Sequence, residues 1–436
     1  SVYNKNYTYN GGGVYLGGTM TVSGSPNITG NKKDDKENNV FFAQHISDDG
    51  YYTMSIGNGG LTSGASIGVT SSKALSNGDS VTIVDSGATS GSESYFTADA
   101  GDPIKVVRDR TELFLVNGTL SHKHPVCGKT CTHKGAHSDV TWTPINSATE
   151  LQNAAGGSSA ETTQYYYLTD NVSLDTTWTP SGYLALDLNG YTLDTKQNIN
   201  IIQLDSDTNL TLTSCFDGGT VQHESNAYGR GVIVASGATF TMYNVELTNH
   251  QETDAKNDAS SGGGSVLVKD GSTFNMYSGT ISNGQAYLGG GVSVVDGSTF
   301  NMYGGTISGN KAIDPVGTGS YGDGGGVYVY KSTFNMTGGE IKNNSASVKG
   351  GGVYVTTSSN FTVNRTVKIT DNKVGQSTTS NVYLTSSNTI ALGSNLSTDS
   401  RIGVEKENYS TTPVQFAANA TDTLENYRKI FSSDLG

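Results

Sequence analysis

The sequence predicts an all-β protein built as a parallel β-helix solenoid, and three observations predict it. One pattern recurs through residues 262–355, with a fourth copy that starts at Gly350: a glycine triplet, a short alternating run, then Ser-Thr-Phe-Asn-Met or a close variant. The phenylalanines of this pattern fall at positions 274, 300, 334 and 361, spaced by 26, 34 and 27 residues. The apolar runs are short and alternate with period two, which indicates strands rather than helices.

Stacking of these repeats explains how so short a unit can be stable. One repeat cannot bury its own apolar face, but successive copies can place like residue on like at about 4.8 Å per strand. Three short strands per turn describe a solenoid. The glycine triplets suit a corner that needs positive φ or close backbone approach. The 34-residue interval carries the segment 313–323, which we expect to bulge from one corner.

Asparagines occupy an equivalent place in several repeats. Asn310, Asn344 and Asn372 each lie three residues after an isoleucine, and Asn31 fits the same pattern. We interpret them as a ladder whose side-chain amides bond to the rungs above and below. A row that binds a ligand is the alternative interpretation.

The end of the chain repeats its beginning, because the triplet at Gly11 returns at Gly350. This predicts two tandem modules, the first truncated. The expected parts are the C-terminal rungs and β cap of a preceding module, a Cys/His-rich junction, a parallel β-helix and a second C-terminal β cap. Their predicted bounds are residues 1–117, 118–145, 146–380 and 381–436.

Three details of this organisation are expectations of their own. Residues 104–115 alternate and predict a closing hairpin for the first cap. The second copy runs to Gly436 without such a hairpin, which we interpret as a cut in a longer chain, with strands supplied from elsewhere as the alternative. Residues 148–155 predict a short helix that plugs the start of the second module.

Composition excludes some classes of partner. The 436-residue chain has a formal net charge of −13, and its 26 Lys and Arg residues form no large cluster. This charge argues against nucleic acid and anionic membranes as partners. No apolar run approaches the ~20 residues that a membrane helix needs, so we expect no membrane insertion.

The junction holds the sharpest candidate for a cofactor. Its Cys-x3-Cys-x-His-x3-His pattern has pair spacings that zinc sites use, and a tetrahedral metal site would stiffen a joint that has no core. A disulfide between Cys127 and Cys131, with no cofactor, is the alternative in an oxidising compartment. The predicted zinc ligands are Cys127, Cys131, His133 and His137, with His124 as an alternate.

A set of tyrosines predicted to face outward is the candidate ligand face. Aligned aromatic side chains on a flat sheet can stack on sugar rings or dock a protein, and they are also favourable strand residues with no further role. The set comprises Tyr277, Tyr303, Tyr328, Tyr330 and Tyr354.

Polar residues that could carry catalysis are few. The pairs Asp205/Asp207 and Glu252/Asp254 are spaced by two, but turn-rich surroundings favour solvated turn carboxylates. His223 and His250 are isolated in the sequence, which favours a turn or surface role.

The repeats resemble right-handed parallel β-helix (pectin lyase-like) repeats of bacterial cell-surface proteins and adhesins. The unit from His124 through Cys127 and His137 to Trp142 is similar to the start of such modules. The resemblance implies a secreted or cell-surface location and neighbouring modules in the same chain, and it supplies no catalytic residue. The expected function is a non-enzymatic adhesin or stalk that binds a glycan or a host protein. The alternatives are a polysaccharide lyase or glycoside hydrolase, and a filament-forming subunit that associates head to tail.

Overall fold

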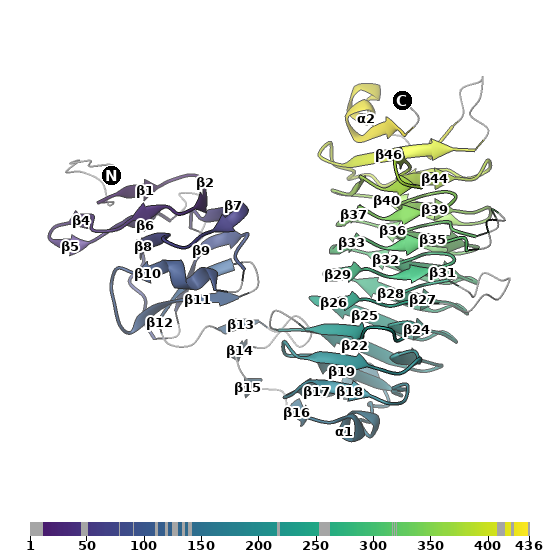
Figure 1. Ribbon diagram of the computed structural model, residues 1–436, viewed down its shortest axis with the longest axis horizontal. Helices are drawn as coiled ribbons and strands as arrows, with labels where there is room; N and C mark the ends of the chain where they lie inside the picture. The colour runs from purple at the N-terminus through teal and green to yellow at the C-terminus, as the bar shows by residue number, and fades with distance from the viewer. Residues whose placement is uncertain are drawn as a thin grey trace. The chain divides into compact units, whose positions relative to one another are not determined.

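The computed structural model divides the chain into two compact units, which are described separately (Figure 1). The N-terminal unit comprises residues 1–124 and 128–139, and the C-terminal unit comprises 125–127 and 140–436. The residues that the structure describes are 12–44, 51–77, 79–89, 91–109, 112–117, 121–123, 130–132, 136–137, 142–215, 219–252, 262–315, 317, 319, 321–407, 415–419 and 423–434.

The C-terminal unit is a parallel β-solenoid, and one wall is a sheet of 11 strands (the phenylalanine sheet). All of its pairings are parallel, as the period-two repeats predicted. In spatial order its strands are β16 (Trp142–Ile145), β17 (Gln164–Leu168), β19 (Tyr183–Asp187), β22 (Asn209–Thr213), β25 (Thr239–Tyr243), β28 (Thr273–Met276), β32 (Thr299–Met302), β36 (Thr333–Met336), β40 (Asn360–Val363), β45 (Ile390–Leu392) and β47 (Ala417–Ala418).

A second set of 17 strands contains two columns that meet at β46 (Arg401–Lys406). The first column is β18 (Val172–Leu174), β20 (Thr192–Thr195), β23 (Thr220–His223), β26 (Val245–Thr248), β29 (Gly279–Ser282), β33 (Thr306–Ser308), β37 (Glu340–Lys342) and β41 (Lys368–Thr370). The second is β21 (Ile202–Leu204), β24 (Val232–Val234), β27 (Val266–Val268), β31 (Val292–Val295), β35 (Val327–Tyr330), β39 (Val353–Val355) and β44 (Val382–Leu384), and β48 (Phe431–Ser433) pairs with β46.

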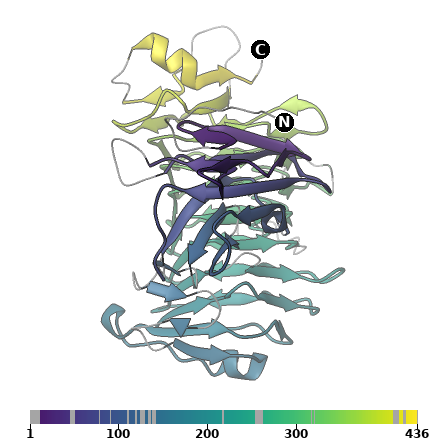
Figure 2. The ribbon, with the colours of Figure 1, turned by 90° about the vertical axis from the view of Figure 1, so that its left-hand side faces the viewer.

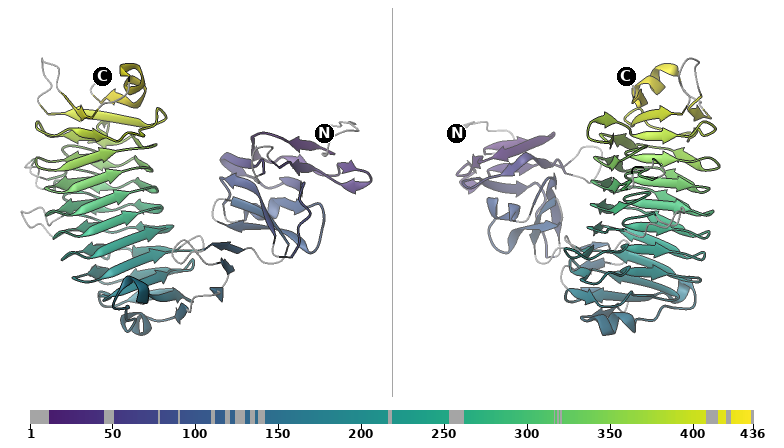
Figure 3. Two further views of the ribbon diagram at one scale, coloured as in Figure 1. Left: turned by 180° about the vertical axis from the view of Figure 1, so that it is seen from behind. Right: turned by 45° about the vertical axis from the view of Figure 1, so that its right-hand side comes forward.

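Short strands at one corner belong to the later turns of the coil. They are β30 (Gln285–Ala286), β34 (Lys311–Ala312), β38 (Ser345–Ala346), β42 (Lys373–Val374) and β43 (Thr378–Thr379). One turn therefore runs from β28 through β29, β30 and β31 back to β32, directly above its start. Figures 2 and 3 show these coils following one another from teal to yellow.

Like residues stack on like in the core, as predicted. The rings of Phe240, Phe274, Phe300, Phe334 and Phe361 are stacked with centroids 4.8 to 5.0 Å apart. All five side chains are at most 1% exposed. In-register parallel pairing places every equivalent side chain one strand spacing above the last, which is why the sequence must repeat.

The asparagine ladder is confirmed as a structural device. Asn310 Nδ2 donates to Asn344 Oδ1, and Asn344 Nδ2 donates to Asn372 Oδ1, both over 2.9 Å. The ladder packs against the third glycine of the later triplets, at Gly291, Gly326 and Gly352: a β-carbon on Gly352 would come within 2.8 Å of Asn372 Nδ2. The triplet and the asparagine are thus two halves of one packing motif.

The triplet at 262–264 differs from the others by one position. Gly262 pairs with Leu288, which precedes the next triplet, so Ser265 takes the place of the third glycine. Gly263 has a φ of 78°, matching 61° at Gly289. The expected corner with positive φ therefore exists. It lies one residue later in this copy than the alignment of the glycine triplets indicates.

Short helices lie at both ends of the C-terminal unit. The predicted plug is confirmed as α1 (Ala148–Gln152), where Ser147 Oγ caps Glu150 N–H and Leu151 is fully buried. The 3₁₀ helix η2 (Ala160–Thr162) follows. At the other end α2 (Leu424–Ile430) begins after Thr423, whose side chain caps Asn426 N–H.

The N-terminal unit has two small sheets, a ribbon and a separate three-stranded sheet, and the hairpin predicted at 104–115 is confirmed as β11 and β12. One sheet is β1 (Val14–Leu16), β6 (Val40–Phe42), β8 (Ser66–Ser71) and β10 (Phe96–Ala98), with β3 (Asn27–Ile28) on β8. The other is β11 (Ile104–Asp109), β12 (Glu112–Asn117), β9 (Ser80–Ser86), β7 (Met54–Leu61) and β2 (Met20–Gly24). The remaining elements are η1 (Ser92–Tyr95), the ribbon β4 (Lys32–Lys33) and β5 (Lys36–Glu37), and the sheet β13 (Ser121–Lys123), β14 (Thr130–Thr132) and β15 (Ala136–His137).

Candidate functional site

A tyrosine stack covers the outer face of β35, β39 and β44. Register places Tyr328, Tyr354 and Tyr383 directly above one another, while the valines that flank Tyr328 and Tyr354 point into the core. The ring centroids are 5.7 and 5.4 Å apart, with interplanar angles of 4° and 13°. The rings cover one another's faces, and neighbouring residues cover most of the rest: Tyr328 and Tyr383 are 7% and 5% exposed, and Tyr354 is half-buried.

Charged residues lie against this stack. The backbones of Asp323 and Lys349 pair as a parallel β-bridge just before β35 and β39. Lys349 Nζ lies 4.8 Å from the centroid of the Tyr383 ring and 3.8 Å from Glu407 Oε1. We call Asp323, Lys349, Tyr354, Tyr383 and Glu407 the outer-face cluster.

Several ionisable groups of the cluster have shifted pKa values. Burial raises the pKa of Asp323 to about 7, although Lys349 opposes the shift. Burial alone would lower the pKa of Lys349, but its contacts with Tyr383 and Glu407 raise it. Burial, with the charge of Asp323, raises the pKa of Tyr354. The cluster therefore offers a carboxyl group that titrates near neutrality, an ammonium group and phenolic hydroxyls in one place.

The tyrosine stack also packs against a second cluster of buried apolar residues, separate from the solenoid core. Tyr328 is 7% exposed and packs in a group with Leu288, Leu267 and Ile233. Apolar side chains beside hydrogen-bonding groups are the combination that small-molecule and sugar sites use. The arrangement brings tyrosine side chains and the charge of Lys349 together beside this apolar cluster.

The other predicted tyrosines lie in a different place. Tyr277 and Tyr303 directly follow β28 and β32 of the phenylalanine sheet. They stack with Tyr243, a residue outside the predicted set that ends β25, and the centroids are 4.6 and 4.5 Å apart. Tyr277 and Tyr303 are 41% and 43% exposed. Burial, then the neighbouring Tyr277, raises the pKa of Tyr243 to about 12. Tyr330 is half-buried, with Lys331 Nζ 4.9 Å from its ring centroid. The predicted face is thus two stacks plus Tyr330.

The predicted zinc ligands fall largely outside the described residues. Cys127, His133 and His124 lie outside them. In the backbone register of β13, β14 and β15, Cys131 pairs with His122 on one side and His137 on the other. His122 is not among the predicted ligands.

Two expectations about isolated polar residues are wrong. His223 and His250 are buried and paired, with their Nδ1 atoms 2.8 Å apart, because neighbouring rungs stack residues that lie 27 positions apart. Glu252 is buried and bonds to Arg230 over 2.6 Å, whereas its sequence neighbour Asp254 lies outside the described residues. Asp207, in contrast, is exposed in a turn, as expected.

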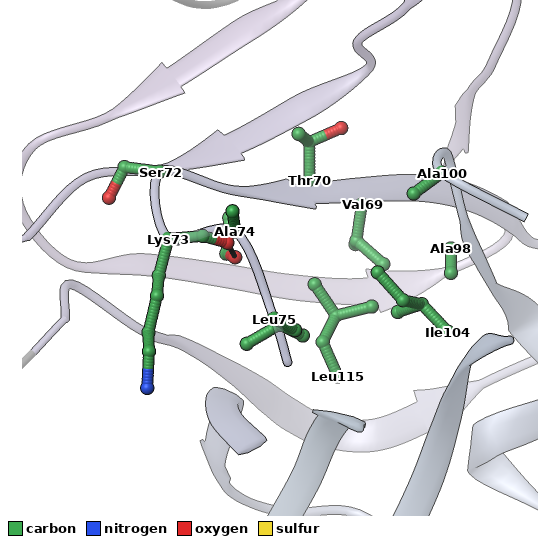
Figure 4. A pocket seen from close by; sticks show the side chains of 11 residues that line it. Val69, Thr70, Ser72, Lys73, Ala74, Leu75, Ala98, Ala100, Ile104 and Leu115 are labelled. Atoms are coloured by element: carbon green, nitrogen blue, oxygen red, sulfur yellow. Dashed lines mark hydrogen bonds between the residues drawn. The ribbon is translucent and has the colours of Figure 1, made fainter. Parts of the chain in front are cut away.

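The N-terminal unit contains a pocket of about 460 Å³ between β8, β10 and the β11–β12 hairpin (Figure 4). Val69, Leu75, Ile104 and Leu115 converge in it, so its lining is mostly apolar. Lys73 at its rim pairs with Asp79 over 3.2 Å.

Comparison with models of known protein families, with curated proteins and with solved structures finds no match to this chain. Among the described residues, no helix has both the length and the apolar character needed to cross a membrane.

Proposed function

We propose that this chain is part of a bacterial cell-surface protein that acts as a non-enzymatic adhesin or stalk. The finer expectation of a right-handed, pectin lyase-like helix belongs to the same proposal, and so does a secreted or cell-surface location. The supporting observation is the combination of a rigid scaffold of side-chain ladders with tyrosines aligned along its outside. Regular stacking favours a supporting role, and aligned outer side chains favour contact with a partner.

The proposed ligand is a glycan or a host surface protein, held at the tyrosine stacks. A glycan array and a cell-binding assay, each with the full chain, test this. The informative variants are Tyr277→Ala with Tyr303→Ala at one stack and Lys349→Met at the other. Tyr228→Ala is the matched control, because Tyr228 is 41% exposed, like Tyr277, and belongs to neither stack. Binding that survives both sets of changes would remove the proposed role of the tyrosines.

Hydrolysis or elimination of a polysaccharide is the second candidate, favoured by the raised pKa of Asp323 beside Lys349 and Glu407. A carboxyl group that is protonated near neutral pH can serve as a general acid. Incubation of the purified chain with common polysaccharides tests this candidate. Release of reducing ends or unsaturated products that Asp323→Asn abolishes would replace the adhesin proposal.

For the junction we propose a structural zinc ion, and a Cys127–Cys131 disulfide is the alternative. The register of β13, β14 and β15 supports a site in which His122 joins Cys131 and His137. Metal analysis of the purified chain, with and without reductant, separates the two. One zinc per chain that Cys131→Ser removes supports the metal, and a loss of two free thiols on oxidation supports the disulfide.

A further inference from the structure

Four strands of each unit pair with one another in the same way. In the N-terminal unit β7 pairs with β9 and β8 pairs with β10, all parallel. In the C-terminal unit β45 pairs with β47 and β46 pairs with β48, again all parallel. Asn39 donates to Asp99 and Asn381 donates to Asp434 at equivalent places. The two caps can therefore be compared strand by strand.

In the N-terminal cap the outer edge of β9 is covered. β12 runs antiparallel along it, with Leu113 opposite Val84 and Leu115 opposite Val81. Leu113 and Leu115 are 0% and 2% exposed, and the same is true of Val84 and Val81. The hairpin thus completes both the hydrogen-bond ladder and the apolar packing of β9.

In the C-terminal cap β47 takes the place of β9. Ala417 pairs with Ile390 as Val84 pairs with Met54. Among the residues that the structure describes, β47 is the terminal strand of its sheet, and Phe416 and Ala417 are only partly buried. The Ala417 carbonyl accepts a hydrogen bond of 2.9 Å from the Gln415 side chain, a local contact that a paired strand would replace.

We propose that the outer edge of β47 is the acceptor for an antiparallel β-hairpin of the β11–β12 type, with leucines at alternate positions. An open strand edge is a template for strand addition, because backbone groups supply the affinity and alternate side chains supply the specificity. The hairpin would set a leucine opposite Ala417, as Leu113 lies opposite Val84. This assigns an interaction surface that the proposed adhesin function does not require.

The test grafts the proposed occupant onto the full chain. A copy of residues 100–117 replaces Leu435 and Gly436, so that Asp434 leads into the hairpin with the spacing that Asp99 has in the N-terminal unit. Hydrogen exchange is then followed at residues 415–419. We expect it to slow by at least about tenfold, as edge amides gain partners. The control carries Leu113→Asp and Leu115→Asp in the appended copy alone.

The proposal fails if the grafted chain and its charged control exchange alike at 415–419. It also fails if the unmodified chain already shows slow exchange there that depends on protein concentration, because a second copy would then be the occupant. Thermal unfolding of both grafted chains, monitored by circular dichroism, verifies that each retains the fold. Slow exchange in the graft alone supports the hairpin.

Discussion

The side-chain amide of Asn381 donates a hydrogen bond of 2.7 Å to Asp434 Oδ1, and this contact ends the asparagine ladder. Asn372 Nδ2 donates to Asn381 Oδ1 over 3.0 Å, so each rung satisfies the next until a carboxylate accepts the last N–H. A carboxylate has only acceptors, which is why it can end such a chain of donors.

Replacement of this terminal acceptor should destabilise the C-terminal unit. Asp434→Ala leaves two buried N–H donors of Asn381 unpaired, and we expect a loss of about 1–3 kcal/mol in the free energy of unfolding. Urea denaturation measures it. Asp399→Ala, at an exposed turn, is the control and should cost less than about 0.5 kcal/mol. Equal losses in the two variants would contradict the role of Asp434.

The sequence predicted the parts of the fold that repeat. The phenylalanine column, the ladder from Asn310 to Asn372 and the helix at Ala148 all follow from periodicity or end position. It could not predict pairs that arise where the repeat varies. His223 and His250 meet only because two irregular rungs stack, and Asp323 lies beside Lys349 because the backbones of their two rungs pair.

In one turn of the solenoid the small and large residues of the asparagine–glycine motif have exchanged places, and this gives a second prediction. Gly284 occupies the ladder position of Asn310, and Ser265 the position of Gly291. A β-carbon on Gly284 would meet Ser265 Oγ at 2.7 Å and the Gly290 carbonyl at 2.3 Å. We therefore expect Gly284→Asn to destabilise the chain and Ser265→Gly to relieve part of that loss.

A double-mutant cycle measures this coupling by urea denaturation. The expected coupling is about 0.5–3 kcal/mol, the range for residues in direct contact. The control pair is Gly284→Asn with Ser308→Gly, whose serine belongs to another rung. If the losses in free energy of unfolding from Gly284→Asn and Ser265→Gly simply add, the collision with the Gly290 carbonyl alone accounts for the cost of Gly284→Asn.

Titration of Asp323 gives a third prediction. Its folded-state pKa of about 7 lies above the ordinary value of 3.8, so the folded state holds the proton more tightly. The contribution of Asp323 to stability is then full below about pH 4 and is lost as the pH rises to about 7. Three pKa units at about 1.4 kcal/mol each bound the loss at roughly 4 kcal/mol. Asp323→Asn should abolish this decline, whereas Asp270→Asn, at an exposed turn, should leave it unchanged.

The buried histidine pair gives a fourth prediction with the opposite sign. Burial, reinforced by His223, lowers the pKa of His250 well below 6.5, and burial also lowers that of His223. The unfolded chain therefore binds protons that the folded chain does not, and the free energy of unfolding falls as the pH drops below about 6.5.

His250→Asn tests this effect, because Gly231 lies beside His250 as Gly291 lies beside Asn310 and leaves room for an asparagine. His223 Nε2 lies 2.8 Å from the Ile199 carbonyl, which makes it the donor there and leaves Nδ1 to accept from His250. We expect the wild-type chain to lose up to about 2 kcal/mol more stability than His250→Asn between pH 7.5 and pH 5. Parallel stability curves for the two chains over this range would show that the pair does not govern acid sensitivity.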